Sequence, residues 1–204
     1  MLGRDGRLVR VAVDGRALPP APTVAVALSG PAVARNLDDR PVWQRVSAVG
    51  VPKDPPPAAR AGMRVTRRFY TPAGDTLDLD TLRQNTSFVL LLEGRAEDGQ
   101  DHYAMVLQGL PAGWEIAGRF GAGSVPGMAW LGELSEAEAQ PASDDRFAAV
   151  LRLTGEAPGF RLAVRLRAVT PGAFELPGAQ AADMYRPAVQ ARQATGRVRV
   201  LPAE

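Results

Sequence analysis

The sequence contains no cysteine, which excludes disulfide bonds, thiolate metal sites and a cysteine nucleophile within this chain. The absence does not identify a compartment, because a cysteine-free protein folds equally well in reducing and oxidising surroundings. No apolar run approaches the ~20 residues of a membrane-spanning helix, and residues 1–6 lack the apolar region of a signal peptide. If the protein is exported, we therefore expect the signal on upstream sequence, as in a C-terminal piece.

The sequence also lacks a large excess of charge of either sign. The 24 basic residues nearly balance the 22 acidic ones, and Lys53 is the only lysine. The arginines are spread along the chain without the interleaved aromatic residues that stack on bases, so we expect no nucleic-acid partner.

Titratable side chains form no recognisable catalytic or metal motif. His102 is the only histidine; it could act as a general base of a hydrolase, but no Gly-x-Ser-x-Gly elbow or zinc ligand set accompanies it. We expect it to be structural or at the surface. The glutamates at 133, 136 and 138 lack the spacing of a calcium loop, and the Asp144-Asp145 pair is typical of a strand start. The sequence therefore predicts no enzyme activity, no metal and no cofactor.

Glycine and proline are abundant, with 21 and 18 residues, and 46% of the residues are hydrophobic. Many short strands joined by turns suit this composition, so we predict an all-β, antiparallel β-sandwich of immunoglobulin type with one or two short helices. The strands expected in the larger part of the chain are Met63–Thr71, Thr86–Leu92, His102–Gln108, Asp145–Thr154, Phe160–Val169 and Gly196–Leu201.

Sequence neighbours among these strands are expected to pair. Thr86–Leu92 should form a hairpin with His102–Gln108, and Asp145–Thr154 a hairpin with Phe160–Val169. Helical turns are predicted within Thr76–Asn85 and, as one or two turns, over Ala179–Tyr185, and Glu133–Glu138 is expected to be a short helix or a loop. Trp114 is expected at the sandwich edge, and Trp130 is expected to anchor the glycine-rich loop over 120–131.

A proline-rich stretch separates two predicted domains. Three consecutive prolines at 55–57 favour a semi-rigid polyproline spacer, so we place the domains at residues 1–57 and 58–204. The first holds only the short strands Leu8–Val13, Thr23–Leu28 and Arg45–Val51. So few strands would have only marginal stability as an independent domain. We therefore expect residues 1–57 to be the C-terminal strands of an incomplete sandwich, followed by the spacer.

The last fifty residues contain the most distinctive pattern. Along Phe160–Val169 apolar residues alternate with arginines, which indicates one buried and one exposed face. Before the final strand, Asp183-Met184-Tyr185-Arg186-Pro187 is predicted to be a stiff corner, because the proline blocks a helix and restricts the residue before it. Met184 and Tyr185 suit either a core-capping corner or a contact surface.

Several motifs in one order resemble the C-terminus of bacterial alpha-2-macroglobulins. They are residues 82–85 (LRQN), 110–116 (LPAGWEI), 144–147 (DDRF), 167–172 (RAVTPG) with Phe174 and Pro177, and 183–187 (DMYRP). The resemblance covers about residues 62–200 well and the first sixty less specifically. It implies that residues 58–204 are the terminal macroglobulin-like domain, and that residues 1–57 complete a sandwich interrupted by the thioester domain.

The family resemblance also implies a function. The chain would be the C-terminal part of a broad-spectrum protease trap in the periplasm or cell envelope. Met184 and Tyr185 would shield the thioester of a neighbouring domain, and Arg186 and Pro187 would fix the shape of that lid. The thioester domain would be the direct partner, and target proteases would be engaged by the whole protein. The alternative is a stand-alone adhesion module that binds carbohydrate or protein through Trp114, Trp130 and Tyr185.

Overall fold

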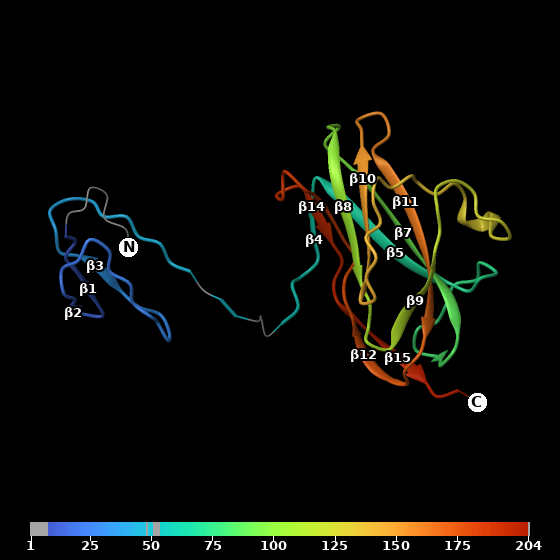
Figure 1. Ribbon diagram of the computed structural model, residues 1–204, viewed down its shortest axis with the longest axis horizontal. Helices are drawn as coiled ribbons and strands as arrows, with labels where there is room; N and C mark the ends of the chain where they lie inside the picture. Colours follow the sequence, from blue (N-terminus) through green and yellow to red (C-terminus); the bar gives the residue numbers. More distant parts are fainter. Residues whose placement is uncertain (1–7, 48, 51–53, 204) are drawn as a thin grey trace. The chain divides into compact units, whose positions relative to one another are not determined.

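The computed structural model describes residues 8–47, 49–50 and 54–203 (Figure 1). The chain divides into two compact units, Met1–Val51 and Pro52–Glu204. Among the described residues, no helix is long and apolar enough to cross a membrane.

The first unit is a small antiparallel sheet in the order β2-β1-β3. Its strands are β1 (Val11–Val13), β2 (Arg16–Ala17) and β3 (Ala34–Asn36). The turn between β1 and β2 has positive φ at both central residues, Asp14 and Gly15, which matches the twist of a tight hairpin. Only three of its described apolar side chains are buried, Val9, Val11 and Ala12.

Two strands predicted in the first unit are not formed. Thr23–Leu28 makes one isolated bridge residue and no ladder, and Val26 and Leu28 are exposed. The described part of Arg45–Val51, residues 45–47 and 49–50, has no strand; Ala48 and Val51 lie outside the described residues. These predictions failed because β propensity alone makes no ladder, and each strand needs a hydrogen-bonding neighbour.

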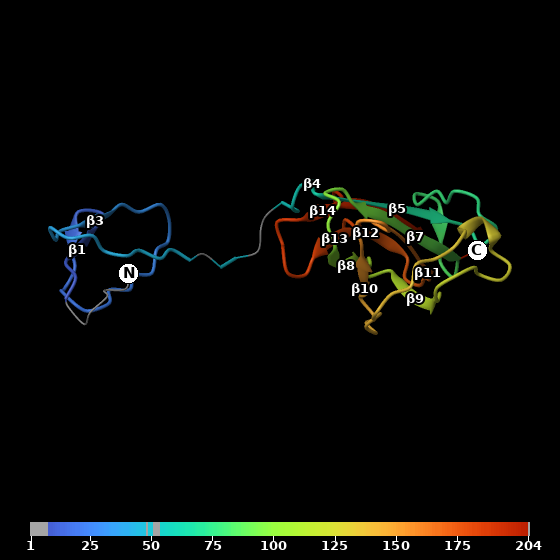
Figure 2. The ribbon, with the colours of Figure 1, turned by 90° about the horizontal axis from the view of Figure 1, so that it is seen from above.

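The second unit is an antiparallel sandwich of two main sheets with a third small one (Figures 1 and 2). The first main sheet, called the β8 sheet, has the order β10-β8-β13-β14-β4. Its strands are β4 (Ala59–Ala61), β8 (His102–Gly109), β10 (Arg146–Leu153), β13 (Gln180–Asp183) and β14 (Gln190–Arg192). The second, called the β7 sheet, has the order β5-β7-β11-β9. Its strands are β5 (Met63–Tyr70), β7 (Ser87–Ala96), β9 (Trp114–Arg119) and β11 (Gly159–Ala168).

The third sheet has the order β12-β15-β6 and closes one end of the sandwich. Its strands are β6 (Leu82–Arg83), β12 (Gly172–Leu176) and β15 (Gly196–Leu201), and β6 is parallel to β15. The inner faces of the sheets form one hydrophobic core. As predicted, the inward residues of β11 are all buried, namely Phe160, Leu162, Val164, Leu166 and Ala168.

Both predicted hairpins are wrong. β7 pairs with β5 and β11, whereas β8 pairs with β10 and β13. β10 likewise lies in the β8 sheet and β11 in the β7 sheet. The connections at 97–101 and 154–158 therefore cross from one layer to the other. Five extended residues reach the ~10 Å between packed sheets, so loop length did not distinguish a hairpin from a crossover.

The predicted helical turns are also wrong. Residues 180–183 form β13, because Gln180, Ala181 and Ala182 complete ladders with both β8 and β14. Residues 76–85 contain β6 instead of a helical turn. Residues 133–138 form a loop, which is one of the two predicted alternatives. The one helical segment among the described residues is a 3-10 turn, Ala129–Leu131.

The outer face of the β7 sheet is partly covered by the loop over residues 120–135. Met128, Leu131 and Leu134 from this loop are buried against Val89, Leu91 and Ala163 of the sheet. The indole N–H of Trp130 donates to the carbonyl of Pro72 at 3.2 Å, and its ring lies 4.9 Å from that of Tyr70. Trp130 therefore anchors this loop, as the sequence predicted.

Candidate functional site

β13 ends at Asp183 and β14 begins at Gln190, and we call residues 183–189, which turn the chain from one strand to the other, the corner (Figure 2). Asp183 N–H donates to the carbonyl of Val189 at 3.0 Å, and Val189 N–H donates to the carbonyl of Arg186 at 2.8 Å. Pro187 takes the second position of the turn over 186–189, where its fixed φ is favourable. These hydrogen bonds and the fixed φ of Pro187 both restrict the backbone of the corner.

Two apolar side chains project from the corner into solvent. Met184 is 46% exposed and Tyr185 is 77% exposed. Beside them on β8, Tyr103 and Met105 are 41% and 40% exposed, and the rings of Tyr103 and Tyr185 meet edge to face at 5.8 Å. We call these four side chains the apolar tip. Met184 N–H donates to the carbonyl of Tyr103 at 2.9 Å, which fixes the tip to the sheet.

Beneath the tip, the carboxylate of Asp183 organises the corner. One oxygen, Oδ1, accepts hydrogen bonds from the backbone N–H of Tyr185 at 2.7 Å and of Arg186 at 2.9 Å. The other, Oδ2, lies 2.8 Å from Nδ1 of His102 and 3.0 Å from Nε of Arg186. Asp183 is only 2% exposed. Burial alone would raise its pKa, but these hydrogen bonds outweigh burial and lower the pKa to about 2.

The Arg186 guanidinium ties the corner to the connection between β7 and β8. It donates to the side-chain oxygen of Gln100 and to the carbonyl of Asp101, in addition to its ion pair with Asp183. The side chain is half-buried. Arg186 is therefore part of the corner's base, and Pro187 is exposed.

His102 completes this base from the first position of β8. The ring is fully buried, and its Nε2 lies 2.7 Å from Oδ1 of Asp98. Hydrogen bonding to His102 and to the N–H of Gln100 lowers the pKa of Asp98. The ring has Asp98, Asp183 and Arg186 as partners and no exposed surface for a substrate. This environment is that of a structural histidine.

The residues proposed for the alternative, a carbohydrate-binding face, do not come together. Trp114 begins β9, the edge strand of the β7 sheet, but its side chain is buried in the core, with its ring 4.9 Å from Phe88 and 5.4 Å from Phe69. Both ring pairs are edge to face, an arrangement that aromatic rings favour. Trp130 anchors the loop over the opposite sheet, so Tyr185 has neither tryptophan as a neighbour.

Sequence reasoning missed the base of the corner. Asp98, Gln100 and Asp101 come from the connection that was expected to belong to a hairpin. Nothing local marks Gln100 and Asp101 as partners of Arg186, more than eighty positions away. Tyr103 and Met105 could have been found, because strand alternation places both on the face opposite to Ala104.

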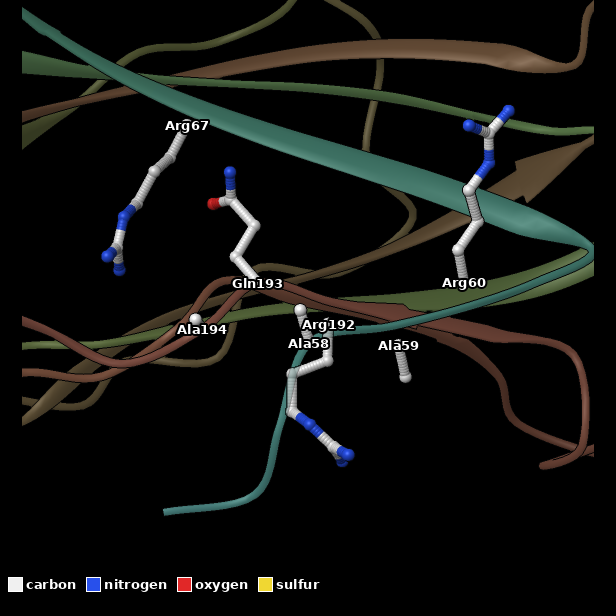
Figure 3. Close-up of a pocket in the computed structure, with 7 residues that line it drawn as sticks. All are labelled: Ala58, Ala59, Arg60, Arg67, Arg192, Gln193 and Ala194. Atoms are coloured by element: carbon white, nitrogen blue, oxygen red, sulfur yellow. The ribbon is translucent and has the colours of Figure 1, made fainter.

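Away from the corner, a hollow lies between β4, β5 and the residues after β14 (Figure 3). Its lining residues are Ala58, Ala59, Arg60, Arg67, Arg192, Gln193 and Ala194. The three guanidinium groups point in different directions in Figure 3, and each has a partner within the chain. Arg60 pairs with Glu97, Arg192 donates to the carbonyl of Pro57, and Arg67 donates to the carbonyl of Pro177. The hollow therefore lacks the convergent donors of an anion site.

Burial lowers the pKa of Arg67 to about 10, and Arg67 shares the carbonyl of Pro177 with the buried amide of Gln108. These contacts belong to the sandwich interior.

Within residues 8–47, 49–50 and 54–203, no group of three or more histidines or acids could hold a metal ion.

Comparison with known proteins identifies the family. The profile described as "Bacterial Alpha-2-macroglobulin MG10 domain" matches residues 62–188. Alpha-2-macroglobulin of Xylella fastidiosa (strain Temecula1) is 31% identical over 171 residues, which cover 78% of this chain and 10% of that protein. Alpha-2-macroglobulin of Escherichia coli K12 is 30% identical over 162 residues, covering 74% and 10%. The chain thus spans about one-tenth of the length of these relatives.

Solved structures agree with the sequence relatives. The native conformation of Escherichia coli alpha-2-macroglobulin matches 75% of this chain and 10% of that one, with a TM-score of 0.64 and 26% identity. Salmonella alpha-2-macroglobulin reacted with methylamine matches 98% of this chain and 14% of that one, with a TM-score of 0.72. At 23% identity, the Salmonella match shows the fold alone. The domain profile, the sequence relatives and the folds together establish that this chain belongs to the bacterial alpha-2-macroglobulin family.

Proposed function

We propose that this chain is the C-terminal part of a bacterial protease trap, and that its corner docks on a neighbouring domain and shields a thioester there. The observation that carries the proposal is the contrast within the corner. A buried polar base holds the backbone of Tyr185 and Arg186, while Met184 and Tyr185 project into solvent. An exposed apolar tip on a rigid base is typical of a contact surface rather than of a core cap.

The physical role of such a tip follows from the chemistry of a thioester. A thioester is an activated acyl group that water and amines attack, so apolar cover preserves it by excluding both nucleophiles. A preorganised corner loses little conformational entropy on docking. The apolar tip also continues from Met184 onto Tyr103 and Met105 of β8, which would extend the cover beyond the corner itself.

Two relatives support this chemistry. The Salmonella protein has been reacted with methylamine, a small amine nucleophile, and the Escherichia coli protein has been activated by porcine elastase. By analogy, the parent of this chain would carry an acyl group that a protease uncovers. This chain has no cysteine to form a thioester, so the direct partner would be the thioester domain elsewhere in the parent protein.

The remaining parts of the proposal concern the whole protein. Target proteases would be bound by the complete trap, in the periplasm or cell envelope, and this chain would act as an inhibitor component rather than as an enzyme. Residues 1–57 would supply the last strands of a preceding β-sandwich and a spacer. Exposed apolar side chains in that unit, such as Val33 and Trp43, fit an incomplete sandwich.

The test is to replace both Met184 and Tyr185 with alanine in the full-length parent protein and to measure the rate at which methylamine consumes the thioester. We expect at least about a tenfold increase, which corresponds to roughly 1.4 kcal/mol of lost protection. Tyr185→Phe should retain most of the cover, because the ring is kept. An exposed control, Arg199→Ala on β15, should react like the unmodified protein. Unchanged methylamine sensitivity in the double variant would overturn the shielding role.

A further inference from the structure

We propose that His102 is the positioning residue of the corner: it holds the Asp183 carboxylate in the orientation that caps Tyr185 and Arg186. The placement of the apolar tip would then depend on a buried imidazole that touches neither tip side chain of the corner. The consequence for a thioester rests on the proposed function, whereas the positioning role can be tested on this chain alone.

The ring of His102 lies at the junction of two segments that are distant in sequence. His102 is the first residue of β8 and faces inward, so it lies where the β7–β8 connection meets the end of β13. Asp98 approaches Nε2 from that connection, and Asp183 approaches Nδ1 from β13. A single side chain thus bridges two segments that are separated by more than eighty residues.

The two ring nitrogens have different requirements. An ionised carboxylate only accepts hydrogen bonds, so Nε2 must carry a proton directed at Asp98. Nδ1 lies 2.8 Å from Oδ2 of Asp183 and 2.9 Å from Nη2 of Arg186, and these neighbours call for opposite roles. A protonated Nδ1 donates to Asp183, while Arg186 still reaches Gln100 and Asp101. An unprotonated Nδ1 accepts from Arg186, which keeps its own bond from Nε to Asp183.

The donating arrangement fixes Asp183 directly through its Oδ2 atom, whereas an unprotonated Nδ1 would place two acceptors, Nδ1 and Oδ2, 2.8 Å apart and is therefore disfavoured. The opposite oxygen, Oδ1, then points at the two corner N–H groups at 2.7 and 2.9 Å. Because the carboxylate is rigid, rotation that moves Oδ2 also removes Oδ1 from these groups. A buried apolar replacement for the ring would fill the space but leave Oδ2 with one fewer partner, which is costly in a buried site. The backbone of Tyr185 therefore depends on His102 through Asp183.

Two matched variants separate positioning from simple loss of packing. His102→Asn keeps a donor near the position of Nδ1 and loses the contact with Asp98. His102→Gln keeps a donor near the position of Nε2 and loses the contact with Asp183. In the 204-residue chain, amide hydrogen exchange should be measured at Tyr185 and Arg186, with the Met184 amide, which donates to Tyr103, as the internal reference.

We expect His102→Gln to accelerate exchange at Tyr185 and Arg186 at least about tenfold relative to Met184, and His102→Asn to accelerate it clearly less. Asp98→Asn should give a smaller increase, and Glu97→Gln, which breaks only the exposed pair with Arg60, should give none. Equal acceleration at all three amides, equal effects of the two His102 variants, or unchanged exchange would each overturn the positioning role.

The functional consequence is measured in the full-length parent as methylamine sensitivity. His102→Gln should increase the reaction rate more than His102→Asn does. If exchange in the chain changes as expected but neither His102→Gln nor the tip double variant alters methylamine sensitivity, the shielding function fails and the positioning role stands. If the tip double variant increases sensitivity while His102→Gln leaves corner exchange unchanged, positioning fails and shielding stands.

Discussion

The outer faces of the two main sheets differ in whether their apolar side chains are covered. On the β7 sheet, the loop over 120–135 buries Val89, Leu91 and Ala163 beneath its own apolar side chains. On the β8 sheet, Tyr103 and Met105 stay exposed, and the nearby corner is held by a buried polar network. The loop over 120–135 is attached to the β7 sheet by apolar contacts and covers it. The corner is attached to the β8 sheet by polar contacts and adds exposed apolar surface beside it.

The two outer faces therefore differ in the apolar surface that they leave exposed. Apolar burial needs only complementary volume, so the loop over the β7 sheet can serve stability alone. A buried charged network is an inefficient way to gain stability, but it fixes a backbone in one orientation. The β8 face therefore has the features of a contact surface, and the β7 face has those of a completed core.

The largest effect is expected from removing the centre of the polar attachment. Asp183→Ala leaves His102 and Arg186 without their shared carboxylate and frees two corner N–H groups, which should lower the free energy of unfolding by about 3–5 kcal/mol. Urea denaturation of the chain measures this. Asp145→Ala, which removes an exposed carboxylate paired with Arg146, should lower it far less. Equal losses in the two variants would erase the distinction between a buried network and a surface pair.

The next largest effect concerns the apolar attachment. Leu131 belongs to the loop that covers the β7 sheet and is fully buried against that sheet. Leu131→Ala should lower the free energy of unfolding by about 2–5 kcal/mol, because apolar burial is lost and a cavity is left. The exposed Val33→Ala should stay within about 0.5 kcal/mol. A change of similar size for Leu131→Ala would mean that the loop covers the sheet without stabilising it.

Acid should weaken the polar attachment selectively. The folded-state pKa of Asp183 is lowered to about 2, so its contribution is present above the ordinary value near 4 and is lost as pH falls toward 2. The contribution amounts to about 2 kcal/mol. Comparing urea unfolding of the unmodified chain with that of Asp183→Asn at pH 5 and pH 2.5 isolates it. The difference between the two proteins should shrink at the lower pH; a constant difference would show that this carboxylate does not titrate as expected.

The smallest effect on stability is expected at the tip. Replacing Met184 and Tyr185 with alanine in the isolated chain should change the free energy of unfolding by about 0.5 kcal/mol or less per residue, because both side chains are exposed. Thermal unfolding measures this. A loss of several kcal/mol would assign the tip to the fold and remove the contrast between the two faces.

The sequence predicted the strands of the second unit better than their partners. β5, β8, β10, β11 and β15 begin and end within two residues of their predicted bounds, and the inward residues of β11 are the expected ones. Strand period decides which face is buried but not which neighbour it pairs with. Both five-residue connections were compatible with a hairpin and with a crossover, so the layers could not be assigned.

The candidate site likewise contains one part that the sequence predicted and one part that it did not. The stiff corner was predictable, because Pro187 acts locally on the backbone around it. The base was not predictable, because the pairing of β8 with β13 brings Asp183 to His102, and only the contact between Asp98 and His102 is local in sequence. One or two helical turns were predicted over Ala179–Tyr185, but residues 180–183 form ladders with strands on both sides.

The two crossovers described above also bear on how the molecule folds. Because β7 and β8, like β10 and β11, are joined by short connections but lie in different sheets, neither pair can form early as an independent hairpin. Apart from the local pairs β1–β2 and β13–β14, most ladders join distant segments. Folds dominated by such non-local pairing typically take milliseconds to seconds to fold. The corner, whose base needs β8 and β13 already in register, should consequently be among the last parts to acquire its final structure.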